Sequence, residues 1–153
     1  ILRSCVIKGR VVEKDETETG IRATLNFGHT LGHLIETHAG YGKYLHGEAV
    51  GVGMFFAAFV SWRCNELVED DWTRIKSYLS QILTPIKLPP LEQSLFREMI
   101  LHDKKAQKQS VNFIMLRKLG ESFIRKETSV EMLWKEFKEF SEKFPELVEI
   151  EEK

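Results

Sequence analysis

The residues most able to do chemistry are histidines gathered in one short stretch. His29 and His33 lie four positions apart, so on a helix their side chains share one face, with Cβ atoms about 6 Å apart. Glu36 extends that face, and His46 follows ten residues later. A neutral imidazole offers a lone pair to a metal ion, and catalytic zinc often combines two or three imidazoles with a carboxylate and one open position. The cluster therefore predicts a metal centre.

A His-x-x-x-His pair also occurs by chance on many helices, but the neighbourhood of this pair favours metal binding. Gly28 and Gly32 flank the two imidazoles and would leave space beside them, and four of the five histidines fall within residues 29–46. His38 is one turn off the shared face, and we expect it at the surface. The residues alone leave open which imidazoles would bind the ion.

The hydrophobic pattern places these histidines among helices. Segment 48–66 is apolar nearly all round, which indicates a buried central helix, and Gly51 and Gly53 within it would let neighbouring helices approach closely. His46 would lie in a glycine-rich loop, 40–47, and the acidic tail 145–153 would be frayed. Further elements are predicted as helices over 2–14, 25–38, 70–83 and 91–102, a hairpin over 111–124 and a last helix that begins at Ser129.

The predicted fold is mainly α: a helical bundle with one small β-hairpin, forming a single domain over residues 1–153. A net charge of −1 provides no positive field for nucleic acid or an anionic membrane, and the longest apolar run, 49–62, is too short to cross a bilayer comfortably. Two cysteines far apart in sequence favour a reducing cytoplasm. The chain starts at Ile1, and we interpret it as a piece of a longer protein.

The stretch from Lys8 to Met54 closely resembles the C-terminal half of the 3-dehydroquinate synthase family. The resemblance rests on Asn-x-Gly-His-Thr-x-Gly-His at residues 26–33, on His-Gly-Glu at 46–48 and on Asp-Lys-Lys at 103–105. It implies a carbon–oxygen lyase of the shikimate pathway, which makes 3-dehydroquinate and phosphate from 3-deoxy-D-arabino-heptulosonate 7-phosphate with zinc (or cobalt) and NAD. Related sugar-phosphate cyclases share much of this pattern.

The resemblance also implies a role for each matching residue. His29 and His46 match two zinc ligands, whereas His33 matches a histidine that contacts the substrate and assists proton transfer. This differs from the interpretation in which the pair four residues apart binds the ion together. The residues that match the family's substrate-binding side chains are Lys8, Arg22, Asn26 and one of lysines 104 and 105, of which we favour Lys105.

Part of the family's machinery is missing from this chain. The family's third zinc ligand, a glutamate, belongs to a preceding domain that also holds NAD, and no Gly-x-Gly-x-x-Gly occurs here. We therefore expect the partners to be a sugar phosphate and the protein's own N-terminal NAD-binding domain, in a cytoplasmic homodimer when full-length, and the isolated chain to be inactive.

Two other functions are weighed against this one. A different sugar-phosphate cyclase would share the histidines, but Lys8 together with Arg22 and Asn26 favours the quinate enzyme. A non-catalytic remnant that serves as a binding module would be favoured by loss of His29, His33 or His46, and all three are present.

Overall fold

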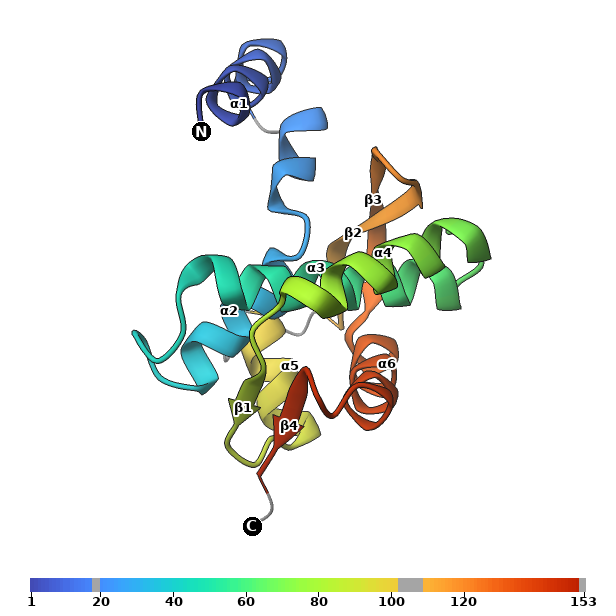
Figure 1. Ribbon diagram of the computed structural model, residues 1–153. Helices are drawn as coiled ribbons and strands as arrows, with labels where there is room; N and C mark the ends of the chain where they lie inside the picture. Colours follow the sequence, from blue (N-terminus) through green and yellow to red (C-terminus); the bar gives the residue numbers. More distant parts are fainter. Residues whose placement is uncertain (18–19, 102–108, 152–153) are drawn as a thin grey trace.

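The computed structural model describes residues 1–17, 20–101 and 109–151, and within them the chain is mainly helical, as predicted (Figure 1). In order, the elements are α1 (Leu2–Lys14), the 3₁₀ helix η1 (Ile21–Asn26), α2 (His29–His38), α3 (His46–Arg63), α4 (Glu69–Ile82), β1 (Ile86–Leu88), α5 (Gln93–Leu101), β2 (Ser110–Lys118), β3 (Glu121–Ser129), α6 (Val130–Lys143) and β4 (Val148–Ile150). None of the described helices is long and apolar enough to cross a membrane.

Helix α3 is the centre of the molecule, as its all-round apolar sequence predicts. Its aromatic side chains pack in edge-to-face and stacked pairs against the helices on either side. The Phe55 ring lies 5.4 Å from that of Trp72 on α4, and the Phe56 ring lies 5.4 Å from that of Phe140 on α6. Figure 1 shows α3 running through the middle, with α2, α4 and α6 around it.

The predicted helix over 25–38 is in fact two pieces, η1 and α2, separated at Phe27 and Gly28. Gly28 has φ +84°, a left-handed conformation that glycine adopts without strain, and a Cβ atom there would lie 2.5 Å from the backbone nitrogen of Met54. A Cβ atom at Gly53 would overlap the carbonyl oxygen of Gly28. The glycines therefore let the backbones of α2 and α3 touch, and Gly28 does not simply leave space beside an imidazole.

The predicted hairpin forms from β2 and β3, which pair antiparallel with Ile114 opposite Ile124. Four consecutive residues, 113–116, are buried, so the expected alternation fails within β2. Ser61 on α3 explains part of this: its buried hydroxyl donates to the Ala57 carbonyl and accepts a hydrogen bond from the backbone N–H of Leu116 at 3.0 Å. This bond holds β2 against α3.

A second small sheet was not predicted. Strands β1 and β4 pair in parallel, with Ile86 opposite Val148 and both side chains buried. The tail expected to fray is thus fixed by β4 as far as residue 150, while residues 152 and 153 lie outside the described part. Strands of three residues carry too little hydrophobic pattern to be recognised, and their pairing joins segments about sixty residues apart.

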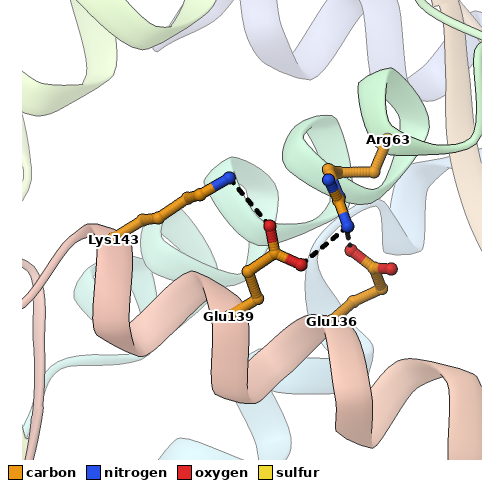
Figure 2. Close-up of polar contacts among 4 residues, drawn as sticks. All are labelled: Arg63, Glu136, Glu139 and Lys143. Carbon is orange, nitrogen blue, oxygen red and sulfur yellow. Dashed lines mark hydrogen bonds and ion pairs between the residues drawn. The ribbon is translucent and has the colours of Figure 1, made fainter.

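A charged cluster joins α3 to α6, and Figure 2 shows its four side chains. The Arg63 guanidinium donates to Glu136 at 3.1 Å and to Glu139 at 2.6 Å, and Lys143 donates to the other oxygen of Glu139 at 2.8 Å. The hydrogen bond from Lys143, with the Arg63 charge nearby, holds the pKa of Glu139 below its usual value. Glu136 is buried, so Arg63 compensates a carboxylate that has lost most of its water.

Helix α1 differs from the other α-helices because none of its residues is buried. It packs against η1 and stands away from the rest of the molecule (Figure 1). Leu2, Val6 and Ile7 are exposed on it, as is Ile1 just before it. Cys5 on α1 and Cys64 after α3 are both free thiols.

Candidate active site

The three histidines singled out from the sequence come together at the start of two helices. His29 is the first residue of α2, His33 lies one turn later, and His46 is the first residue of α3. The predicted loop therefore ends slightly earlier than expected, and His46 belongs to the helix that follows it. The contact between the glycines of α2 and α3 fixes how far apart these helix starts lie.

The spacing of the imidazole rings fits a shared ion. Ring centres are 5.3 Å apart for His29 and His46, 5.5 Å for His29 and His33, and 6.3 Å for His33 and His46. A zinc–nitrogen bond of about 2.0–2.1 Å, with the ring centre roughly 1 Å beyond the nitrogen, puts two tetrahedral imidazole ligands roughly 5 Å apart. His29 and His46 are the pair closest to that value.

The contacts of the Nδ1 atoms of His29 and His46 indicate which ring nitrogen of each histidine is available to bind a metal ion. Nδ1 of His46 lies 3.1 and 3.2 Å from the two carboxylate oxygens of Glu36, and Nδ1 of His29 lies 3.4 Å from the carbonyl oxygen of Phe27. A carbonyl or an ionised carboxylate can only accept, so each contact is a hydrogen bond when Nδ1 carries the proton. The lone pair of each ring then resides on Nε2.

A pocket of about 610 Å³ opens beside His29 and His33. The hairpin forms its opposite wall, where Asn112 and Lys126 supply polar groups that sequence analysis missed. Both lie within the predicted hairpin or just after it, and no motif distinguishes them from ordinary surface residues. Among the described residues, the lining consists of Ala23, Asn26, His29, Thr30, His33, Ile100, Val111, Asn112, Ile114, Ile124 and Lys126. Such a mixture of polar and apolar groups suits a small polyhydroxylated molecule.

A larger hollow, of about 750 Å³, lies along α6 away from the histidines. Its charged lining residues, such as Lys135, Lys138 and Glu142, belong to the solvated face of that helix. We place the site at the smaller pocket because imidazoles, and not volume, carry the chemistry.

Of the residues predicted to bind the substrate, one lines the pocket and two described ones do not. Asn26 lines the pocket with His29 and His33. Lys8 is exposed on α1, and Arg22, on η1, donates from its guanidinium to the carbonyl of Glu16 at 2.8 Å; the described lining of the pocket includes neither. Lys105 and its neighbour 104 lie outside the described residues.

His38, expected at the surface, is only partly exposed, and its Nε2 lies 3.1 Å from the carbonyl oxygen of Pro89. This contact ties the end of α2 to the segment after β1, so His38 has a structural partner away from the cluster. It is not one of the three converging imidazoles.

The metal donors in the described part of the chain are too few for a complete site. No group of three or more His, Cys, Asp or Glu side chains there is arranged to hold an ion. Two imidazoles at a suitable spacing would supply only part of a catalytic zinc site, which usually takes three protein ligands and a water molecule.

Comparison with known sequences gives a consistent match. Residues 1–106 match the family described as 3-dehydroquinate synthase C-terminal. The chain is 46% identical over 120 residues to a 3-dehydroquinate synthase of Geobacter metallireducens, and 48% identical over 120 residues to one of Geotalea uraniireducens. Each match covers 78% of this chain and 33% of the relative, so the chain spans about one third of the length of these proteins.

Solved structures show the same fold. A 2-deoxy-scyllo-inosose synthase complexed with carbaglucose-6-phosphate, NAD⁺ and Co²⁺ aligns with a TM-score of 0.60 and 25% identity, over 78% of this chain and 35% of that one. ValA, a 2-epi-5-epi-valiolone synthase from Streptomyces hygroscopicus with NAD⁺ and Zn²⁺ bound, aligns with a TM-score of 0.58 and 20% identity, over 78% of this chain and 33% of that one.

Proposed function

This chain belongs to the family of 3-dehydroquinate synthase C-terminal domains, and we propose that it is the metal- and substrate-binding part of such an enzyme. The joined enzyme would convert 3-deoxy-D-arabino-heptulosonate 7-phosphate to 3-dehydroquinate and phosphate. The observation that carries the proposal is the convergence of His29 and His46, with ring centres 5.3 Å apart, beside a polar pocket.

His29 and His46 would hold zinc or cobalt through Nε2. The ring spacing and the Nδ1 contacts support this, and two related synthases were solved with Co²⁺ or Zn²⁺. Bound there, the ion would polarise a substrate hydroxyl as a Lewis acid. One further protein donor would have to come from outside the described residues.

His33 would contact the substrate and move a proton instead of binding the metal. His33 lines the pocket and is exposed. Its ring centre lies 6.3 Å from that of His46, farther than the 5.3 Å between His29 and His46. Asn26 at the same pocket would orient hydroxyl groups, and Lys8, Arg22 and Lys105 would bind the anionic groups of the substrate, with the fixed charges that carboxylate and phosphate require.

NAD would be bound by a further domain, since the related synthases that carry NAD⁺ are about three times as long as the matched part. We also infer a cytoplasmic homodimer for the joined enzyme. The alternative is another sugar-phosphate cyclase, favoured by the likeness to 2-deoxy-scyllo-inosose synthase. The identity of 46–48% to 3-dehydroquinate synthases, against 25% to that enzyme, supports the quinate assignment.

A chimaera tests this function. This chain would replace the matching C-terminal part of the Geobacter metallireducens enzyme, to which it is 46% identical. We expect phosphate release from the seven-carbon substrate that needs both zinc and NAD, and no release when His29→Ala is introduced. A folded chimaera that binds NAD and releases phosphate only from a hexose 6-phosphate would favour the alternative. One that binds NAD and releases none from either would contradict the assignment as an enzyme part.

A further inference from the structure

Glu36 is an acidic side chain in direct contact with the imidazole cluster, through His46. It lies on α2 one turn after His33, and its two oxygens are 3.1 and 3.2 Å from Nδ1 of His46 on α3. The near-equal distances place both oxygens around a single ring nitrogen. The carboxylate thus bridges the two helices that carry the proposed metal ligands.

This contact selects one form of the ring. An ionised carboxylate has no proton to give, so Nδ1 of neutral His46 must carry one to make the bond. The Nε2 lone pair then points away from Glu36, on the opposite edge of the imidazole. Metal-binding histidines commonly donate their other ring N–H to a carboxylate or a backbone carbonyl, which fixes both the tautomer and the orientation of the ring.

The exposed fractions of the His46 and Glu36 side chains indicate which of the two restricts the other. The His46 side chain is 58% exposed at the first turn of α3, whereas that of Glu36 is 20% exposed and lies next to buried Ile35. Water screens such a contact, so it adds little to the stability of the fold. Its effect is to restrict a side chain that would otherwise rotate freely.

We propose that Glu36 is a positioning residue that keeps His46 in the Nδ1–H tautomer and aims its Nε2 at the metal. The proposal rests on the proposed role of His46 as a metal ligand. It also reassigns Glu36, which the helical spacing had made a candidate ligand, because its carboxylate occupies the edge of the ring opposite the donor nitrogen.

Glu48 provides a matched control. It is two residues from His46 in sequence, but its carboxylate accepts from the backbone N–H of Leu45 at 2.8 Å, as a helix cap. Glu48→Gln therefore removes the same charge near the site, while the amide oxygen can still accept the capping bond. Glu36→Leu removes the same single charge and also the acceptor, so a loss caused merely by reduced negative charge would appear in both Glu36→Leu and Glu48→Gln.

The first readout needs no metal. Nitrogen-15 NMR of the imidazole rings in the 153-residue chain, at a pH where they are neutral, distinguishes the two tautomers. We expect the Nδ1–H form for His46 in the parent chain and in Glu48→Gln, and a mixture or the Nε2–H form in Glu36→Leu, whose side chain has no acceptor. The second readout is a zinc titration, in which Glu36→Leu should bind about 10–100-fold more weakly than Glu48→Gln.

The outcomes separate this proposal from the proposed function. An Nε2–H tautomer in the parent chain, or an unchanged tautomer in Glu36→Leu, overturns the role of Glu36 whatever the zinc affinity. Weaker zinc binding with an unchanged tautomer would instead make Glu36 a direct ligand. If the tautomer responds as expected while zinc contacts neither His29 nor His46, Glu36 orients the ring but the metal site itself is refuted.

Discussion

For a single histidine, function depends on which ring nitrogen is free and what faces it. Spacing in the sequence was enough to put His29 and His33 on one helix. The approach of His46 and the carboxylate behind its Nδ1 depend on how α2 packs on α3, which spacing does not reveal. Asn112 and Lys126 remained hidden for the same reason, since only the folded hairpin brings them to the pocket.

Glu139 allows a prediction about pH. Its pKa is lowered in the folded protein, chiefly by the hydrogen bond from Lys143, so its contribution to stability is present above its unfolded pKa and is lost as pH falls through its folded pKa. Glu139→Gln should lower the free energy of unfolding near neutral pH by about 0.5–1 kcal/mol, a typical size for a partly exposed pair. Urea unfolding at several pH values measures this.

The difference between the parent chain and Glu139→Gln should shrink toward zero in acid. Glu142→Gln, at an exposed position on the same helix, is the control and should have a small effect at every pH. A loss of stability in Glu139→Gln that stayed constant from neutral to acid pH would show that its ionised carboxylate is not the cause.

Elements whose hydrophobic pattern extends over many residues were predicted well. Elements that form only through contacts between distant segments were not. The helices that became α3, α4 and α6 needed only their apolar positions. The last helix starts at Ser129 as expected, and the Ser129 side chain caps it by accepting from the backbone N–H of Met132. The break at Gly28 and the pairing of β1 with β4 depend on neighbours far along the chain. Local pattern carries little information about such contacts.

Gly53→Ala tests the contact that positions the two helices. The new Cβ atom would overlap the carbonyl oxygen of Gly28, and since both sides are backbone, neither can rotate away. We expect a loss of about 1–3 kcal/mol in the free energy of unfolding, measured by urea denaturation. A displaced His29 should also weaken zinc binding.

Gly47→Ala is the matched control on the same helix, because a Cβ atom there meets nothing within 4 Å. Its stability should match or slightly exceed that of the parent, since alanine favours the helix over glycine. Equal stability of the Gly53→Ala and Gly47→Ala variants would mean that α2 and α3 do not meet closely at Gly28.

At the scale of the molecule, the described structure has a well-packed core but an incomplete site. Phenylalanines of α3 and α6 fill the centre, while α1 exposes Leu2, Val6 and Ile7 and buries none of its residues. The matched part makes up only 33% of the relative from Geobacter metallireducens. A helix with exposed apolar side chains and a candidate metal site that lacks a donor among the described residues are both consistent with a domain that works against another.

This incompleteness sets the expected metal affinity. With two imidazoles and no third donor among the described residues, the 153-residue chain should bind zinc weakly, and it should not bind NAD. Binding that is weak but specific can still be located by NMR, because the nitrogen that coordinates the ion shifts more than any other.

The most direct test is therefore a zinc titration of this chain followed by nitrogen-15 signals of its imidazoles. We predict that Nε2 of His29 and of His46 shift together, that His33 does not follow them, and that His33→Ala leaves the titration unchanged while His29→Ala abolishes it. If His33 shifted with His29, or if His33→Ala lost zinc as readily as His29→Ala, the division of the three histidines into two ligands and one proton-transfer group would be wrong.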